Sequence, residues 1–264
     1  MNDAGAGPFA IRGRWRCGEI TLGAWCSIGN SFSAEIVGRA GFDWVCIDQQ
    51  HGIIGPDALV PMVQAISLSS TPTFVRVPWN EPAAIMRALD AGAQGVIVPL
   101  VNTAADAIAA VDAARYPPLG NRSWGPARPL LEMPGFNPEL ANRRVIVAVQ
   151  IETEQAIANA EEIVNVPGID AAFVGPSDLA LSAGWEPTFA PRRAEHRELI
   201  VRVMEVAHRH GIPAGVYCGT AAQALIWRDD GFEMLAVTSD SIILKSGAEE
   251  ALRVVRHTNG VTRS

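Results

Sequence analysis

Short apolar runs rich in β-branched residues alternate with longer stretches of helical periodicity along the whole chain. Eight of these runs are each followed by a turn containing Gly, Pro, Ser, Asn or Asp, which is typical of strands. The predicted strands span residues 20–26, 44–48, 73–77, 95–100, 145–151, 170–174, 213–217 and 234–238. The predicted helices after them span 31–40, 56–68, 81–91, 103–115, 153–165, 191–210, 220–230 and 240–257.

Residues at the ends of several predicted helices support these boundaries. Thr103 and Asp106 have the spacing of a capping box at a helix start. Glycine in a left-handed conformation commonly ends a helix. Four glycines stand where such an end is expected: Gly41, Gly92, Gly211 and Gly231.

Eight alternating strand and helix units predict an α/β fold, a (β/α)8 TIM barrel that forms a single domain over residues 1–264, with 1–19 as an N-terminal extension. The alternative is a doubly wound open sheet. That fold usually carries a G-x-G-x-x-G turn after its first strand, whereas residues 23–27 here read Gly-Ala-Trp-Cys-Ser. The segment 117–142, rich in Pro, Gly and Asn, is long for a connection, and such loops are usually functional or mobile.

Composition narrows the class of protein. The net charge of −7 argues against nucleic-acid binding, which needs a basic face. The longest charge-free stretch, 58–75, contains two prolines and several polar residues, so no membrane span is expected. No long apolar stretch follows the N-terminal arginines, and the four cysteines lack C-x-x-C spacing. We therefore expect a cytoplasmic protein with reduced, mostly buried thiols.

Two carboxylates stand at the ends of neighbouring predicted strands, Glu152 after 145–151 and Asp178 after 170–174. In a (β/α)8 barrel the chemistry lies at the C-terminal ends of the strands. A pair of carboxylates without nearby histidine or thiol suits a hard divalent cation such as Mg²⁺ or Mn²⁺. The alternative is that each carboxylate stabilises the start of the helix that follows it.

His51 is the one histidine that directly follows a predicted strand, and Asp48 lies three residues before it. This arrangement suits a general base whose ring is oriented by a carboxylate. The alternative is a histidine hydrogen-bonded within a loop. The remaining histidines fall on predicted helices among charged residues and are expected at the surface: His196, His208, His210 and His257.

Arg76 ends an apolar strand, and a guanidinium facing a barrel interior needs an anionic partner. A substrate oxygen could supply it, or a structural ion pair with Glu152 or Asp48. Trp25 is either a pocket wall or a core residue.

The turn Gly175-Pro176-Ser177 is expected to present free backbone N–H groups to a carboxylate or phosphate.

Together these stretches resemble the HpcH/HpaI aldolase family of metal-dependent class II pyruvate aldolases. The resemblance covers nearly the whole chain. It is carried by Gly23-Ala24-Trp25, Ala40-Gly41-Phe42-Asp43-Trp44, Ile47-Asp48-x-x-His51, Val75-Arg76-x-x-Trp79-Asn80, Pro99-Leu100-Val101, Arg115-Tyr116-Pro117-Pro118-x-Gly120-x-Arg122, Gln150-Ile151-Glu152-Thr153 and Gly175-Pro176-Ser177-Asp178-Leu179.

The resemblance implies aldol cleavage or condensation of 4-hydroxy-2-oxo acids through an enolate, giving pyruvate, or a related 2-oxo acid such as hydroxypyruvate, and an aldehyde. It implies a Mg²⁺, Mn²⁺ or Co²⁺ ion and a homo-oligomer, usually a hexamer, in which the last helix is exchanged between subunits. The aldehyde end of the pocket is expected from the segment 117–142, the Trp25 region and a neighbouring subunit.

The resemblance also implies residue roles. Glu152 and Asp178 would bind the metal, His51 with Asp48 would transfer the proton, and Arg76 would hold the enolate oxygen. Asp90 would act from a neighbouring subunit; the alternative is a surface carboxylate at a helix end. The predicted substrate-binding residues are Trp25, Gln150, Gly175, Pro176 and Ser177. Several members have Glu before the histidine, whereas this chain has Gln50, which leaves the substrate range open.

Three other functions are considered. A Schiff-base aldolase would have to use Lys245, the single lysine, which falls on the last predicted helix instead of inside a strand. A lyase acting on acyl-coenzyme A esters belongs to the same superfamily. A barrel that binds a 2-oxo acid without turning it over is the third.

Overall fold

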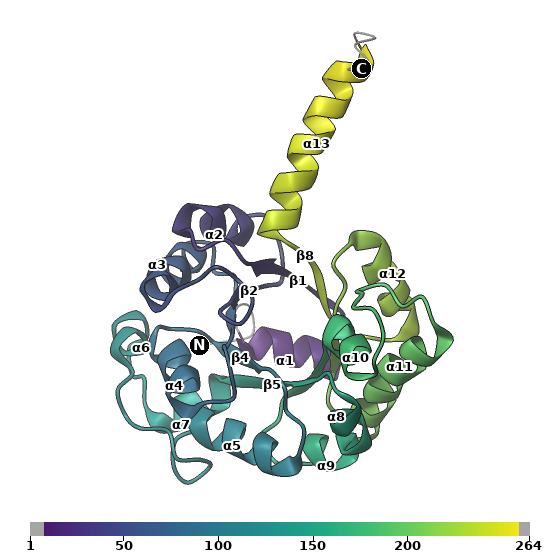
Figure 1. Cartoon of the computed structure of the whole chain (residues 1–264). Coiled ribbons are helices and arrows are strands. Elements are labelled where there is room, and N and C mark those ends of the chain that lie inside the picture. Colours follow the sequence, from purple (N-terminus) through teal and green to yellow (C-terminus); the bar gives the residue numbers. More distant parts are fainter. Residues whose placement is uncertain (1–7, 259–264) are drawn as a thin grey trace.

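The computed structural model describes residues 8–258 and contains a closed barrel of eight parallel strands in sequential order, β1 to β8. This confirms the predicted fold (Figure 1). The strands are β1 Thr21–Cys26, β2 Trp44–Asp48, β3 Thr73–Arg76, β4 Gly95–Val98, β5 Ile146–Ile151, β6 Ala171–Val174, β7 Ala214–Tyr217 and β8 Met234–Ser239.

Helices surround the barrel (Figure 1). They are α1 Pro8–Arg16, α2 Ser31–Gly38, α3 Pro56–Ser67, α4 Pro82–Asp90, α5 Ala104–Ala114, α6 Ala127–Glu132, α7 Pro138–Arg144, α8 Glu154–Ala158, α9 Ala160–Val164, α10 Pro176–Ser182, α11 Ala194–Arg209, α12 Ala221–Asp230 and α13 Asp240–Thr258. The sequence did not predict α1, α6, α7 or α10. The helix predicted over 153–165 is divided at Asn159 into α8 and α9.

The predicted helix ends are confirmed. Thr103 and Asp106 form both hydrogen bonds of a capping box at the start of α5. The four glycines expected after helices all have positive φ, for example 112° at Gly231 after α12. A residue with a side chain rarely adopts this conformation, so glycine sets these helix ends.

Aromatic rings fill the inside of the barrel. Trp25 stacks on Phe173 at a centroid distance of 5.6 Å and meets Trp44 edge to face at 5.9 Å. Glycine on a neighbouring strand makes room for these rings, because a Cβ on Gly23 would lie 2.2 Å from the Trp44 ring. A larger apolar layer fills the space between the strands and the surrounding helices.

Helix α1 covers the end of the barrel where the strands begin. Its Ile11 and Trp15 are buried in the same cluster as the interior aromatic residues. Trp15 donates a 3.0 Å hydrogen bond from its indole N–H to the Thr21 hydroxyl at the start of β1. Part of the predicted extension 1–19 is therefore packed on the barrel, while its residues 1–7 lie outside the described part of the chain.

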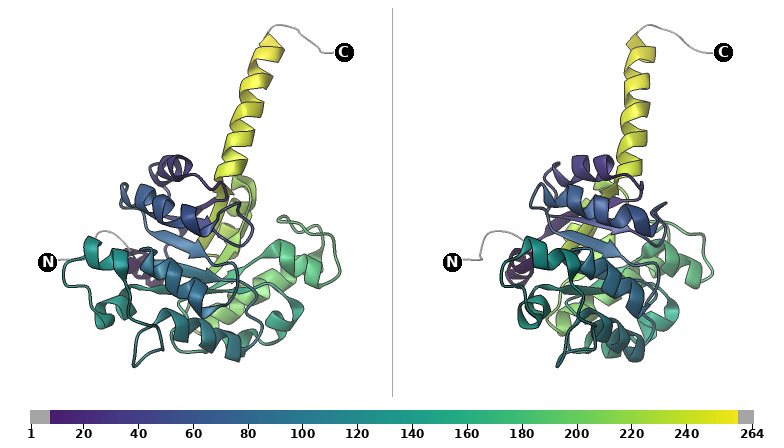
Figure 2. Two further views of the ribbon diagram at one scale, coloured as in Figure 1. Left: turned by 60° about the vertical axis from the view of Figure 1, so that its left-hand side comes forward. Right: turned by 90° about the vertical axis from the view of Figure 1, so that its left-hand side faces the viewer.

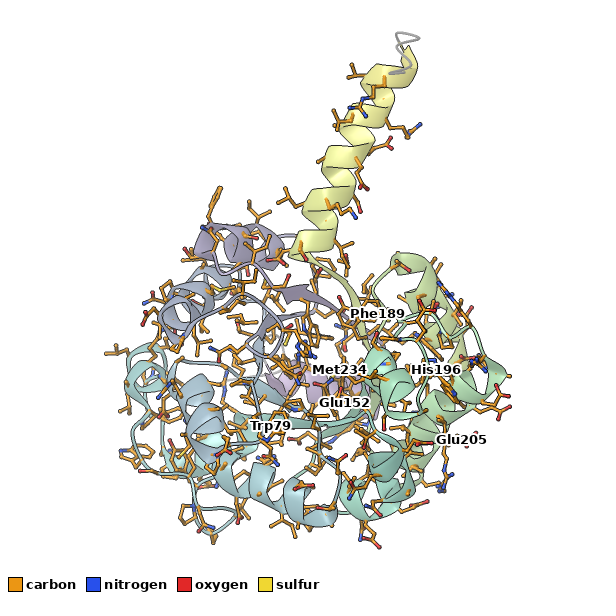
Figure 3. The ribbon with its side chains drawn as sticks, in the orientation of Figure 1. Trp79, Glu152, Phe189, His196, Glu205 and Met234 are labelled. Atoms are coloured by element: carbon orange, nitrogen blue, oxygen red, sulfur yellow. The ribbon has the colours of Figure 1, made fainter. Side chains whose placement is uncertain are left out.

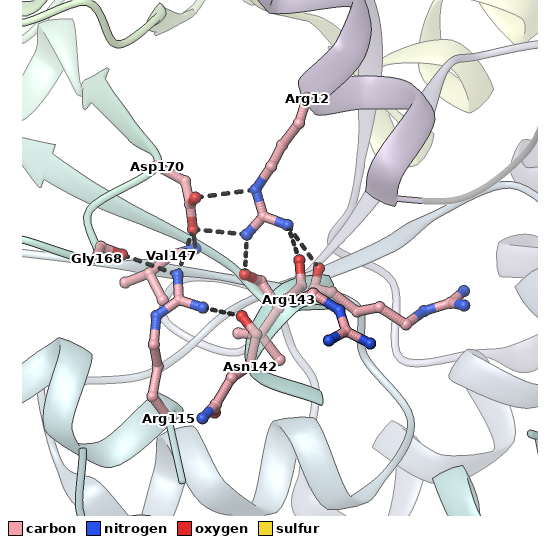
Figure 4. A network of polar contacts seen from close by, with 9 residues as sticks. Arg12, Arg115, Asn142, Arg143, Val147, Gly168 and Asp170 are labelled. Atoms are coloured by element: carbon pink, nitrogen blue, oxygen red, sulfur yellow. Dashed lines mark hydrogen bonds and ion pairs between the residues drawn. The ribbon is translucent and has the colours of Figure 1, made fainter. Parts of the chain in front are cut away.

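A partly buried polar network ties α1 to the barrel (Figure 4). The Asp170 carboxylate accepts two hydrogen bonds from Arg12, at 2.9 and 3.0 Å, and one from Arg115 at 2.8 Å. It also accepts the backbone N–H of Val147 at 2.8 Å. One carboxylate thus neutralises two partly buried guanidinium groups at the closed end of the barrel.

Helix α13 extends away from the barrel after its first turns (Figures 1 and 2). Leu244, Leu252 and Val255 on this helix are 66%, 52% and 60% exposed. Within residues 8–258 no helix combines the length and the apolar character needed to span a bilayer.

Candidate active site

A cavity of about 510 Å³ opens at the C-terminal ends of the strands. This is the barrel end where the sequence predicts the chemistry. The predicted residues that line it are Trp25, Asp48, His51, Arg76, Gln150, Gly175, Pro176, Ser177 and Asp178.

Asp48 and Arg76 are register partners on β2 and β3, so their side chains emerge next to each other. Arg76 donates from Nε to Oδ1 of Asp48 at 2.8 Å and from Nη2 to Oδ2 at 2.6 Å. The Arg76 guanidinium also lies 5.5 Å from the Trp25 ring centroid. Of the partners considered for Arg76, the structure shows Asp48, and the arginine still lines the cavity.

The prediction that Asp48 orients the His51 ring is wrong. Oδ1 of Asp48 accepts the backbone N–H groups of Gln50 and His51, at 3.1 and 3.2 Å, and both carboxylate oxygens bind Arg76. Asp48 therefore shapes the turn that carries His51, because a short acidic side chain readily bonds backbone N–H groups two or three residues on. The His51 side chain is exposed at the cavity.

Glu152 is fully buried directly behind the cavity wall. Its Oε1 accepts the N–H of Leu100 at 2.9 Å, and its Oε2 accepts the Gln150 amide at 2.8 Å. Leu100 has a φ of 53°, which is uncommon for a residue with a side chain and marks a constrained site. Gly175 is required here, because a Cβ would lie 2.2 Å from Oε2 of Glu152.

The two predicted metal ligands interact electrostatically. The pKa of Glu152 is raised to about 7, mainly by burial and also by the charge of Asp178, against the opposing effects of the Leu100 hydrogen bond and the Arg76 charge. Asp178 is half-buried and faces the cavity. Neither carboxylate caps a helix by hydrogen bonding, since Thr153 caps α8 and the cap of α10, Gly175, makes no side-chain bond.

These residues fit a divalent cation. A cation would relieve the repulsion between Glu152 and Asp178, and Oε1 of Gln150 is a buried oxygen without a hydrogen-bond partner. No third His, Cys, Asp or Glu completes a cluster within residues 8–258. Mg²⁺ is commonly held by one or two carboxylates together with water and substrate oxygens, so a two-carboxylate site suits it.

Asp90 does not line this cavity. It lies at the end of α4, where Arg122 donates a 2.6 Å hydrogen bond to it. Arg122 is buried and stacks on Tyr116, with 4.6 Å from its guanidinium carbon to the ring centroid.

The surface prediction for His196 is wrong. Its ring is buried, donates through Nε2 to the Pro176 carbonyl at 2.9 Å, and contacts Trp185 edge to face. His208 and His210 are exposed and pair with glutamates, as predicted for the surface. The His257 side chain lies outside the part that the structure describes.

Sequence reasoning missed the rest of the cavity wall. Phe189 packs against Tyr217, with 4.9 Å between the ring centroids. Figure 3 shows Glu152 near the middle of the barrel and His196 farther out. The segment 117–142, expected at the aldehyde end, contributes no lining residue within one chain. The unpredicted lining residues are Ser27, Phe173, Phe189, Tyr217, Ser239, Ser241 and Ile242.

The remaining sequence predictions concern lysine and cysteine. Lys245 lies on α13 with a side chain that is 76% exposed, and it does not line the cavity. All four cysteines are free thiols; Cys26, Cys46 and Cys218 are buried, and Cys17 is exposed.

The fold and the site define a (β/α)8-barrel enzyme with an arginine, a histidine and a carboxylate lining one cavity and a second, buried carboxylate interacting with the first. Comparison with known proteins names the class: the chain belongs to the HpcH/HpaI aldolase/citrate lyase family, whose model matches residues 21–245. It is therefore a carbon–carbon lyase of the aldolase type.

Three relatives illustrate this membership. The hydroxypyruvate/pyruvate aldolase of Rhizorhabdus wittichii is 37% identical over 93% of this chain and 98% of its own length. The 4-hydroxy-2-oxo-heptane-1,7-dioate aldolase of Salmonella typhimurium is 35% identical over 91% of this chain and 92% of its own length. A crystal structure of an HpcH/HpaI aldolase/citrate lyase family protein from Burkholderia cenocepacia superposes with a TM-score of 0.87 at 32% identity. The superposition covers 94% of this chain and 99% of that protein.

Proposed function

We propose that this chain catalyses the metal-dependent cleavage and formation of 4-hydroxy-2-oxo acids, with pyruvate or hydroxypyruvate and an aldehyde as the partners. The observation that carries the proposal is that Arg76, His51 and Asp178 line one cavity, while the buried Glu152 interacts electrostatically with Asp178 and hydrogen-bonds the lining residue Gln150. The names of the relatives support this substrate class.

Glu152 and Asp178 would hold a Mg²⁺, Mn²⁺ or Co²⁺ ion, with the free oxygen of Gln150 close by. When bound, the ion supplies Lewis-acid polarisation of the carbonyl of a 2-oxo acid. The turn at Gly175, Pro176 and Ser177 offers the first N–H groups of α10 to the substrate carboxylate. Trp25 forms the floor of the cavity beside Arg76.

Arg76 would bind the oxygen of the 2-oxo acid that becomes negative as the enolate forms. The two hydrogen bonds to Asp48 fix the guanidinium in advance, so little reorganisation accompanies the development of charge. His51 is exposed at the cavity and would take the proton from the methyl carbon, directly or through water. In the cleavage direction the same ring would take the proton of the 4-hydroxyl group as the carbon–carbon bond breaks to give the aldehyde and the enolate, and would then donate that proton to the enolate carbon.

Assembly is part of the proposal. The exposed apolar side chains of α13 would pack on a neighbouring copy in a homo-oligomer, which we propose is a hexamer. Asp90, which lies away from its own cavity, would act in the cavity of a neighbour. The buried free thiols support a reducing compartment such as the cytoplasm.

The direct test is exchange of the pyruvate methyl protons in D₂O, a half-reaction that needs no aldehyde. We expect exchange with Mg²⁺, Mn²⁺ or Co²⁺, loss of exchange after chelation, and loss in Glu152→Gln and Asp178→Asn. Glu205→Gln, at an exposed position of α11, is the matched control and retains exchange. Near-normal exchange in either site variant, or in excess EDTA, would contradict the proposal.

A further inference from the structure

Three serine hydroxyls form a continuous row on one wall of the cavity. Oγ of Ser239 lies 3.0 Å from Oγ of Ser241, and Oγ of Ser241 lies 2.9 Å from Oγ of Ser27. All three residues line the cavity. They come from the ends of β8 and β1 and from the start of α13, across the barrel from β5, which carries Gln150.

The row ends on a buried carboxylate. The Ser27 hydroxyl donates to Oδ1 of Asp240 at 2.9 Å. Asp240 also accepts the backbone N–H groups of Ser27, Ile28 and Ser241, at 2.8, 3.1 and 2.8 Å. An ionised carboxylate only accepts hydrogen bonds, so this end of the row has no proton to give.

The carboxylate therefore fixes the direction of every hydrogen bond in the row. Each serine hydroxyl has one proton and two lone pairs. Ser27 gives its proton to Asp240, so the contact between Ser27 and Ser241 uses the proton of Ser241. The contact between Ser241 and Ser239 then uses the proton of Ser239. All three protons are committed within the row.

What remains on this wall is acceptor capacity. Ser27 and Ser241 each keep one lone pair, whereas the two lone pairs of Ser239 accept the Ile242 N–H at 3.3 Å and the hydroxyl of Tyr217. Because the Ser239 proton is used within the row, Tyr217 supplies the proton of its bond to Ser239 and has none left to give. The flanking residues Phe189 and Ile242 are apolar. Among the described lining residues the one arginine or lysine is Arg76, which is already paired with Asp48. A carboxylate or phosphate placed here would meet lone pairs and apolar surface without a donor.

We propose that the wall formed by Ser27, Ser239 and Ser241 selects substrates that carry a neutral hydroxyl group, which donates to these oxygens, and disfavours substrates with an anionic tail. This inference rests on the proposed aldolase function and specifies its substrate class. The hydroxyl could belong to the aldehyde or to the 2-oxo acid, and the two sources are separated by the choice of substrates.

The test compares pairs of substrates in which a hydroxyl is replaced by a methyl group. One pair is glycolaldehyde and propanal with pyruvate; the other is hydroxypyruvate and 2-oxobutanoate with propanal. Intrinsic reactivity differs within a pair. The measured quantity is therefore the kcat/KM of the hydroxyl substrate divided by that of its methyl analogue, compared between wild type and variant. In the double variant Ser27→Ala/Ser241→Ala we expect the ratio of at least one pair to fall about tenfold, the size of one lost hydrogen bond. The pair that responds identifies the source of the hydroxyl.

Matched variants separate this effect from a structural one. Ser33 also bonds Asp240, at 3.3 Å, but does not line the cavity, so Ser33→Ala should leave both ratios unchanged. Ser241→Thr keeps a hydroxyl and should retain the wild-type ratios. Pyruvate exchange without aldehyde, measured on the wild type, tests the proposed function separately. Unchanged ratios in the double variant, or use of succinic semialdehyde as efficient as that of glycolaldehyde, would overturn the inference while exchange persists.

Discussion

Arg76 and Asp48 form a two-bond ion pair, Nε to Oδ1 at 2.8 Å and Nη2 to Oδ2 at 2.6 Å, between register partners of adjacent strands. Burial, the largest single effect, lowers the pKa of Arg76, but the hydrogen bond and charge of Asp48 together raise it above its usual value. The guanidinium is thus held charged and in a fixed orientation in the cavity wall, where the residue is only 9% exposed.

Replacing Asp48 by Asn should destabilise the protein, because Arg76 would keep a buried charge without a counter-charge. We expect the free energy of unfolding to fall by roughly 3 kcal/mol. Urea unfolding measures this change. Glu35→Gln breaks the exposed pair between Arg39 and Glu35 and should cost less than about 1 kcal/mol. Equal losses in the two variants would contradict the importance of burial.

The pairing of Asp48 with Arg76 shows what the sequence could predict. Strand periodicity and the sequential order of a barrel place both residues at the same end of neighbouring strands, so their proximity follows from the fold. The same reasoning brought Glu152 and Asp178 together. The partner of a side chain is harder to predict, because Asp48 had two candidates within reach and bonded Arg76 instead of the His51 ring.

Other features depend on packing that leaves little local signal. His196 stands between Glu195 and Arg197, which indicates a surface, yet it lies on the face of α11 that packs on α10. Ser27 and Ser239 become neighbours of one cavity only when β8 pairs with β1. Serine is so common in turns that neither position stood out.

Glu152 predicts a specific dependence of stability on pH. Its folded-state pKa of about 7 lies above the ordinary 4.5, so the folded protein keeps a proton that the unfolded chain releases. Its favourable contribution is present below pH 4.5 and is lost as the pH rises towards 7. In EDTA, from pH 5 to 8, we expect wild type to lose on the order of 2 kcal/mol more unfolding free energy than Glu152→Gln.

Urea unfolding at the two pH values checks this difference. Mg²⁺ should restore the loss in wild type at pH 8, because it binds the ionised carboxylate, and should leave Glu152→Gln unaffected. Glu205→Gln, at an exposed position, should behave as wild type. Parallel pH profiles for wild type and Glu152→Gln would show that the buried carboxyl is already ionised at pH 5.

His196 should produce the opposite pH trend. Burial lowers its pKa, while its hydrogen bond to the Pro176 carbonyl opposes that shift. The stabilising contribution is therefore present above the ordinary pKa of 6.5 and is lost as the pH falls through the lowered value. His196→Gln keeps a donor without a titrating ring, so its unfolding free energy should fall less than that of wild type between pH 7 and 5. A larger fall in the variant, measured by urea unfolding, would rule out this assignment.

Lys245 is expected to be dispensable for catalysis. It is exposed on α13 and lies outside the cavity, so no Schiff base can form with a substrate held there. Lys245→Arg should keep pyruvate exchange and aldol turnover within about twofold, and borohydride should trap no pyruvate adduct on wild type. A large loss in this variant, or a trapped adduct, would support the Schiff-base mechanism.

The last prediction concerns α13 and the assembly. Leu244, Leu252 and Val255 recur at helical spacing, so they form an apolar stripe on a helix that extends into solvent in one chain. A second copy of the chain would bury this stripe, and Leu244→Glu/Val255→Glu should therefore dissociate the oligomer by placing charges in the contact. Analytical ultracentrifugation measures the mass, with Glu249→Ala, at an exposed polar position of the same helix, as the control that stays assembled.

If assembly also carries Asp90 into a neighbouring cavity, the dissociated variant should lose turnover to about the extent that Asp90→Ala does in the intact oligomer. A fully active monomer would exclude any role for Asp90 across subunits.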